Sequence, residues 1–228
     1  MWIAIILIVV IIGIIIAKTA YSNLLNYYYS KINDIAIINS TSAQVLTLLS
    51  MNLGLNIRIF QKGEKLDNFY SPRNEAIFLS KEVYNSRSIP AIAISMHELG
   101  HAIQHKNSSN LFNLHKICNV LNKISSIIFI PLIILLIVSL IFFSNVISLT
   151  ILYILISLWL VNFISRFILI FLERDASKRA LKLMKDYRIL DEDEIPIAKK
   201  LLNKALLTYI GGIFHNIIKF FMNLKKLF

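Results

Sequence analysis

The chain has 228 residues, which is long enough for one modest domain and a few membrane spans. Hydrophobic residues make up 57% of it and the mean hydropathy is +0.67, with much of the apolar content in unbroken runs, which excludes an ordinary soluble protein. The net charge of +11 fits positive segments beside anionic lipid headgroups better than a nucleic-acid-binding surface. The lone Cys118 excludes an intramolecular disulfide framework and a cysteine-based zinc cluster.

The first apolar run covers residues 1–17, carries no charged side chain and ends at Lys18. Its length is at the short end for a transmembrane helix. A secretory signal peptide is the alternative, but it needs a positive region before the apolar run and small residues at a cleavage site. Met1 and Trp2 carry no positive side chain, and residues 17–20 match such a site only weakly. We therefore expect a retained N-terminal transmembrane anchor over residues 1–17.

The next segments predict a short helix followed by β structure. Polar residues at 40–42 are suited to cap a helix over residues 43–51, which Gly54 would end. Residues 56–60 then alternate in polarity, and residues 76–79 form a short apolar run beyond two groups of turn residues. A small hairpin or sheet is expected here.

A second helix is predicted from Ser88 to His105. Ser88 is a favourable N-cap and Pro90 fits the first helical turn. Apolar residues recur at three- and four-residue spacing, which indicates one buried stripe: Ile89, Ile92, Met96, Leu99 and Ile103. The second half of this helix is too polar to span a membrane, so we place it in the domain outside the bilayer.

This helix carries the pattern His97-Glu98-Leu99-Gly100-His101. His97 and His101 are four residues apart, so their imidazoles project from one side of the helix and are suited to fill two positions of a tetrahedral zinc site. Glu98 is placed to take a proton from an activated water molecule. A catalytic zinc site needs a third protein ligand and one open position, and we expect that ligand to be a carboxylate from another segment. Gly100 would let a neighbouring backbone or the metal approach closely.

A long apolar block covers residues 124–172 and contains one charged residue, Arg166. Its length predicts two spans, with the turn at Ser144 and Asn145. Such a hairpin returns the chain to the side it left, so residues 18–123 and 173–228 share one face of the membrane. Both segments carry more Lys and Arg than Asp and Glu, which favours a cytoplasmic location for that face.

Several carboxylates on that face are candidates for the third ligand. Glu173 stands out because it follows directly where the last span leaves the bilayer, at the start of a continuing helix with a polar face. An equally weighted alternative is that Glu173 and Asp175 only pair with nearby basic residues. The full set of candidates is Asp67, Glu75, Glu82, Glu173, Asp175 and the acidic run 191–194.

Four stretches together resemble the YugP-type family of neutral zinc metallopeptidases: residues 66–72, 79–80, 97–104 and 173–177. The chain also resembles, more distantly, the HtpX-type and CAAX prenyl proteases. The resemblance covers most of the chain and implies that His97, His101 and Glu173 bind one Zn²⁺ per chain and that Glu98 is the general base. Two positions depart from the expected pattern. Ser177 stands where the HtpX-type pattern has an Asp beside a ligand His, and Ser42 stands where a small Gly is expected.

The expected fold is a mainly α membrane protein with a gluzincin-like zinc-peptidase domain and a small β hairpin or sheet. It comprises an anchor (residues 1–17), the metallopeptidase domain (18–118), a transmembrane helical hairpin (124–172), and a segment with the third-ligand helix and an amphipathic end (173–228). The apolar stretch 206–222 is expected to lie at the membrane interface or to be partly inserted. The expected location is a bacterial plasma membrane, with the active site facing the cytoplasm.

The implied function is hydrolysis of peptide bonds in protein or peptide substrates, including membrane-associated ones, with no nucleic-acid partner. Residues 75–80 are proposed as an edge strand that pairs with an extended substrate. A second electrophile would stabilise the oxyanion, and its candidates are Tyr187, Tyr209, His215 and Arg179. A catalytically inactive membrane scaffold that retains the fold is the main alternative. An intramembrane protease is disfavoured, because the helix around His97 is not a long apolar span.

Overall fold

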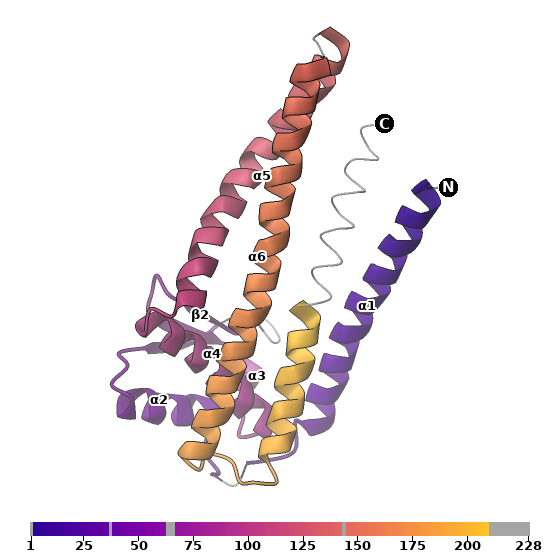
Figure 1. Cartoon of the computed structure of the whole chain (residues 1–228). Helices are drawn as coiled ribbons and strands as arrows, with labels where there is room; N and C mark the ends of the chain where they lie inside the picture. The colour runs from indigo at the N-terminus through magenta and orange to yellow at the C-terminus, as the bar shows by residue number, and fades with distance from the viewer. Residues whose placement is uncertain (1, 37, 63–66, 143–144, 210–228) are drawn as a thin grey trace. The chain divides into compact units, whose positions relative to one another are not determined.

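The structure, a computed structural model, describes residues 2–36, 38–62, 67–142 and 145–209 (Figure 1). It divides into two compact units. One consists of Ser108–Leu172, and the other of the chain up to Asn107 together with the chain from Glu173 onward. The second of these contains the small sheet and every residue of the candidate site, so it is described first.

Two helices open the chain. α1 (Trp2–Lys31) continues well beyond the apolar run with which it begins. α2 (Ser42–Asn52) starts at a capping box in which the Thr41 side chain accepts from the Gln44 amide and the Gln44 side chain accepts from the Thr41 amide. Gly54 follows with a φ of +62°, which a glycine adopts readily. The predicted capped helix ended by Gly54 is confirmed to within one residue at each end.

The sheet has three short strands, β1 (Arg58–Gln61), β2 (Phe69–Ser71) and β3 (Ala76–Leu79), in the order β1-β3-β2. β2 and β3 form an antiparallel hairpin, whereas β1 pairs with β3 in parallel. The prediction of a small hairpin or sheet is confirmed. The prediction that residues 75–80 form an edge strand is wrong: β3 is the central strand, so its backbone groups already pair with β1 on one side and β2 on the other.

The helix with the histidine motif, α4 (Ile89–Lys106), follows the short α3 (Lys81–Tyr84). The Ser88 side chain caps α4 by accepting from the Ala91 amide, and Pro90 lies in the first turn. The predicted apolar stripe is buried from Ile89 to Leu99, and Ile103 is partly buried against the same core. α4 contacts α1, α2, α3 and the sheet, so it forms the centre of this unit.

Two later segments complete the unit. The last part of α6 (Asn145–Asp186), from Glu173 onward, buries Ala180 and Met184 in the same core as α4. After a short turn, residues 195–209 form another helix, drawn in yellow in Figure 1, which buries Leu201 and Leu202 there. The predicted apolar segment 206–222 lies outside the described residues beyond Tyr209.

The other unit, Ser108–Leu172, contains most of α5 (Asn110–Phe142) and the first part of α6. The two helices contact each other through a small cluster around Ile133, Ile151 and Leu155. A buried hydrogen bond from Ser139 to Ser148 joins them near the turn. Within the described part of the chain, α5 and α6 are the two helices long and apolar enough to cross a membrane, as judged by length and composition.

Candidate metal centre

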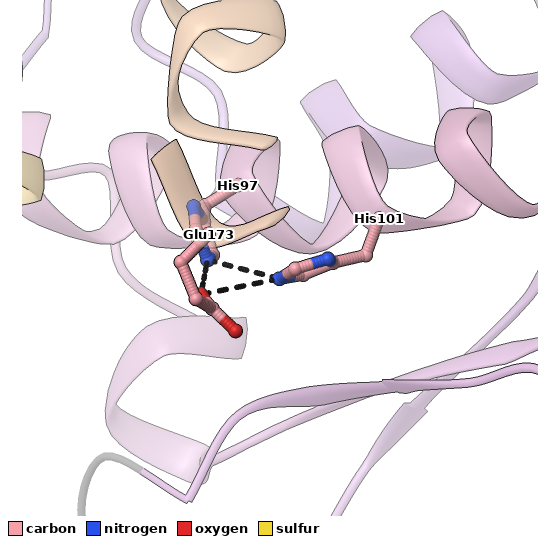
Figure 2. A group of neighbouring side chains, drawn as sticks. All are labelled: His97, His101 and Glu173. Carbon is pink, nitrogen blue, oxygen red and sulfur yellow. Dashed lines mark hydrogen bonds and ion pairs between the residues drawn. The ribbon is translucent and has the colours of Figure 1, made fainter. Parts of the chain in front are cut away.

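Three side chains from two helices meet at one point (Figure 2). His97 Nε2 lies 3.1 Å from Glu173 Oε2, and His101 Nε2 lies 3.4 Å from the same oxygen. The two Nε2 atoms are 3.2 Å apart. Each side chain is at least four-fifths buried. Within the described ranges, this trio is the one group of His, Cys, Asp or Glu side chains arranged to hold a metal ion.

The spacing of these three atoms fits a zinc ion. Zn²⁺ binds imidazole nitrogen and carboxylate oxygen at about 2.0–2.2 Å, and in a tetrahedron with such bonds the ligand atoms are roughly 3.3–3.6 Å apart. The observed separations of 3.1, 3.2 and 3.4 Å are close to that range. Two imidazoles and one carboxylate are also a known donor set for catalytic zinc, one that leaves the fourth position open.

The approach of α6 to α4 depends on Gly100. A Cβ atom at this position would lie 2.5 Å from the Ala176 carbonyl oxygen, which is too close for any other residue without a shift of the backbone. Gly100 directly precedes His101, and Ala176 lies about one helical turn after Glu173. The expected role of Gly100 in allowing close approach is therefore seen here, and the neighbour it admits is the backbone of α6.

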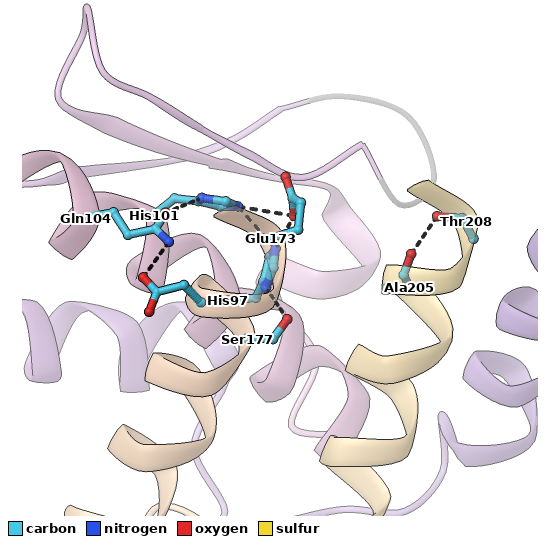
Figure 3. Close-up of polar contacts among 8 residues, drawn as sticks. His97, His101, Gln104, Glu173, Ser177, Ala205 and Thr208 are labelled. Atoms are coloured by element: carbon cyan, nitrogen blue, oxygen red, sulfur yellow. Dashed lines mark hydrogen bonds and ion pairs between the residues drawn. The ribbon is translucent and has the colours of Figure 1, made fainter. Parts of the chain in front are cut away.

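Ser177 lies beside the outer nitrogen of His97. Its Oγ is 3.1 Å from Nδ1 of His97, while Nε2 of the same ring faces Glu173 (Figure 3). A hydroxyl that accepts a hydrogen bond from Nδ1–H leaves the lone pair on Nε2, which a metal requires. The sequence left the role of this serine open, because the HtpX-type pattern has an Asp here. In the structure the serine oxygen occupies the supporting position.

A series of hydrogen-bonded polar side chains supports His101 in the same way. Its Nδ1 lies 2.9 Å from Gln104 Oε1, and Gln104 Nε2 donates to Asp175 Oδ2 at 2.8 Å. Arg179 Nε donates to the same carboxylate oxygen at 2.7 Å. Asp175, a candidate ligand from the sequence, therefore supports the site from outside the cluster. Sequence reasoning missed Gln104, although it lies one turn beyond His101 on the same helix face.

Opposing effects set the pKa values of His101 and Glu173. Burial alone would lower the pKa of His101, but the hydrogen bond and charge of Glu173, together with the charge of Glu98, raise it to about 9. Burial alone would raise the pKa of Glu173, but its hydrogen bonds to His101 and His97 hold it well below the usual range. Without a metal, the carboxylate and a protonated imidazole therefore hold each other in place.

Glu98 is buried beside this cluster, with 7% of its surface exposed. Burial raises the pKa of its carboxyl group, although the two histidines and a hydrogen bond from the Tyr70 backbone amide oppose this. A buried carboxylate with a raised pKa is a better proton acceptor than an exposed one, as a general base requires. Tyr70 belongs to β2, so the edge of the sheet contacts Glu98 directly.

Of the three candidates for a second electrophile that the structure describes, one lies beside the metal centre. Tyr209 lines the same cavity as His97 and Glu98, and its hydroxyl group hydrogen-bonds to Glu173. Burial and the two nearby carboxylates raise its pKa, which keeps this hydroxyl protonated. Arg179 is bound to Asp175 instead, and Tyr187 is exposed after the end of α6. His215 lies outside the described residues.

The other polar candidates lie elsewhere. His105 is one turn further along α4, where its Nδ1 lies 2.8 Å from the Tyr70 hydroxyl oxygen, away from the three-residue cluster. The remaining acidic candidates also lie outside that cluster: Asp67, Glu75, Glu82 and residues 191–194.

A cavity of about 170 Å³ opens beside His97 and Glu98. Its other walls come from α1, from α4, from the loop before β2 and from the helix over residues 195–209. The lining residues are Leu24, Tyr28, Asn68, Ile94, His97, Glu98, Leu201, Leu202, Ala205, Thr208 and Tyr209.

Comparison with known proteins identifies the family of the chain. A protein of Bacillus subtilis (strain 168) named "Putative membrane protease YugP" is 34% identical over 150 residues, which are 64% of this chain and 62% of that protein. The match thus spans less than two thirds of the relative's length. No solved structure matches the chain. The model of the family described as "Putative neutral zinc metallopeptidase" matches residues 2–226. Because that match covers nearly the whole chain, the chain belongs to this neutral zinc metallopeptidase family.

Proposed function

We propose that this protein is a membrane-bound zinc endopeptidase in which His97, His101 and Glu173 hold one zinc ion and Glu98 is the general base. One observation carries the proposal: three donor atoms from two helices lie 3.1–3.4 Å apart, next to a buried fourth residue with the properties of a base. Membership of a zinc metallopeptidase family supports the choice of metal and of reaction class.

The chain's own residues account for the proton transfers. Zinc held by the three ligands would lower the pKa of a water molecule and polarise the scissile carbonyl group. Glu98 takes the proton from the attacking water and later delivers it to the leaving nitrogen. The hydroxyl of Tyr209 donates a hydrogen bond to the oxygen on which negative charge develops. Ser177 and Gln104 hold the two imidazoles so that each Nε2 lone pair faces the cluster.

Association with the membrane is proposed from the apolar helices. In the unit formed by Ser108–Leu172, most large hydrophobic side chains of α5 and α6 are exposed, and a lipid bilayer would cover them. We place the bilayer around residues 124–172, and the apolar run 1–17 adds an anchor by composition. The excess of Lys and Arg outside these runs favours a cytoplasmic active site. The relative named a membrane protease supports association with a membrane.

Full-length protein in detergent tests the proposal through zinc content and cleavage of a broad peptide library. The wild type should contain about one zinc per chain and cleave internal peptide bonds. Glu98→Gln should keep the zinc and lose cleavage, because an amide cannot accept the proton. Glu75→Gln is the matched control, since Glu75 is exposed and lies outside the site. Full activity of Glu98→Gln would contradict the assignment of the base, and zinc without any turnover in the wild type would favour an inactive scaffold.

A further inference from the structure

The cavity beside the metal centre has an apolar wall. That wall is built by Leu24 of α1, Ile94 of α4, and Leu201, Leu202 and Ala205 of the helix over residues 195–209. The volume of about 170 Å³ is close to that of apolar protein cavities of roughly 150 Å³ that hold one benzene molecule. The space therefore matches one aliphatic or aromatic side chain.

The charge of the lining disfavours acidic occupants. No Lys or Arg is among the described residues that line the cavity, so none of these residues offers an acidic side chain a Lys or Arg ion pair. The titratable residues that line the cavity include Glu98 and His97. An acidic occupant would also be repelled by the buried Glu98 carboxylate. An apolar side chain gains from leaving water and meets neither penalty.

Tyr28 is a further residue that lines the cavity. This residue of α1 is completely buried, and its hydroxyl group has no hydrogen-bond partner within the part of the chain that the structure describes. Burial, followed by the nearby charge of Glu82, raises its pKa to about 12, so the hydroxyl remains a donor at neutral pH. The hydroxyl oxygen is buried as well, so Tyr28 closes part of the cavity wall and its hydroxyl is not open to an occupant.

We propose that this cavity is the substrate subsite next to the scissile bond and that it accepts one apolar side chain such as Leu or Phe. This inference rests on the proposed peptidase function, because the metal and Glu98 define which bond is cleaved. It makes α1 part of the substrate site through Leu24 and Tyr28, and it makes Ala205 the residue that sets the depth of the subsite.

Binding of simple inhibitors tests the subsite without any turnover. The probes are short peptide hydroxamates, which anchor on the metal and differ only in the residue next to the hydroxamate: Gly, Leu, Phe or Asp. Their Kd values are measured by calorimetry on full-length, zinc-loaded protein in detergent. The Leu and Phe probes should bind about tenfold or more tightly than the Gly and Asp probes, as expected for burying a side chain of that size. Equal affinity for all four probes, or no binding of any, would overturn the subsite.

One variant and its matched control test whether the probes bind in this cavity. Ala205→Leu should remove most of the advantage of the Leu and Phe probes and leave the Gly probe nearly unaffected, because the added side chain fills the cavity. Asn203→Leu is the matched control, since Asn203 is exposed on the same helix and does not line the cavity. Equal losses in both variants would contradict the role of Ala205.

Cleavage of the peptide library by the same wild-type preparation distinguishes a failure of the subsite from a failure of the peptidase function. Cleavage without preference for apolar residues would overturn the subsite and leave the peptidase function standing. Selective hydroxamate binding without any cleavage would overturn the peptidase function and support the subsite as a binding pocket.

Discussion

Gly100 of α4 and Ala176 of α6 are in such close contact that a Cβ atom on the glycine would lie 2.5 Å from the alanine carbonyl oxygen. The contact lies between the two ligand-bearing helices, one residue before His101 and three after Glu173. It therefore determines how closely the carboxylate approaches the imidazoles.

Gly100→Ala should weaken zinc binding strongly, because α6 must move away and carry Glu173 with it. We expect at least a tenfold loss of zinc affinity, together with a lower midpoint of thermal unfolding. Competition with a zinc chelator measures the first and calorimetry the second. Ala102→Gly, on the same helix and also buried, is the control that should lose stability but keep zinc. Wild-type zinc affinity in Gly100→Ala would show that the helices tolerate a wider separation.

Gln104→Ala should reduce zinc affinity by about tenfold to a hundredfold, the usual effect of removing a partner of a ligand histidine. The substitution releases Nδ1 of His101 and also removes the link to Asp175. Gln61→Ala, at an exposed position on β1, should leave zinc affinity unchanged. If both variants bind zinc like the wild type, the series of hydrogen-bonded side chains from Gln104 to Arg179 serves stability alone.

The role of Ser177 as a hydrogen-bond acceptor for His97 can be tested by removing the acceptor or by replacing it with another. Ser177→Ala should lower zinc affinity by about tenfold, because Nδ1 of His97 loses its neighbour. Ser177→Asp should restore affinity to the wild-type level or above, since a carboxylate accepts the same hydrogen bond more strongly. The same chelator competition measures both variants. An alanine variant that binds zinc as tightly as the wild type would show that the serine does not orient His97.

Tyr209→Phe should lower kcat by about tenfold to a hundredfold with little change in KM, because the lost hydrogen bond matters when negative charge develops on the oxygen. Zinc content should stay at the wild-type level. Tyr187→Phe is the control, since Tyr187 is exposed and away from the cavity. An increase in KM at constant kcat would assign Tyr209 to substrate binding in place of oxyanion stabilisation.

Local sequence patterns predicted the parts of the fold that depend on neighbouring residues. The N-terminal starts of α2 and α4 follow from Thr41, Ser88 and Pro90, whose effects act within one turn. The pattern of two histidines four residues apart places both on one face for the same reason. The expected topology makes Glu173 a candidate ligand, because a hairpin of two apolar helices returns the chain to the side of the membrane that it left.

Contacts between distant segments could not be predicted from the sequence. β3 was expected at an edge because nothing in residues 75–80 reveals that β1, eighteen residues earlier in register, pairs with it in parallel. The hydrogen bond from Gln104 to Asp175 joins residues 71 positions apart and has no local pattern. Tyr28 and Tyr209 come from opposite parts of the chain, and only the packing of α1 against the helix over residues 195–209 brings both to the cavity.

The most direct test of the metal centre is the zinc content of purified full-length protein beside that of Glu173→Ala. The wild type should hold about one zinc per chain, and the variant should lose most of it, because two imidazoles alone bind zinc weakly. Glu192→Ala, at an exposed position in the acidic run, is the matched control and should keep its zinc. Zinc content in Glu173→Ala equal to that of the wild type would contradict the account, because it would remove the carboxylate from the site.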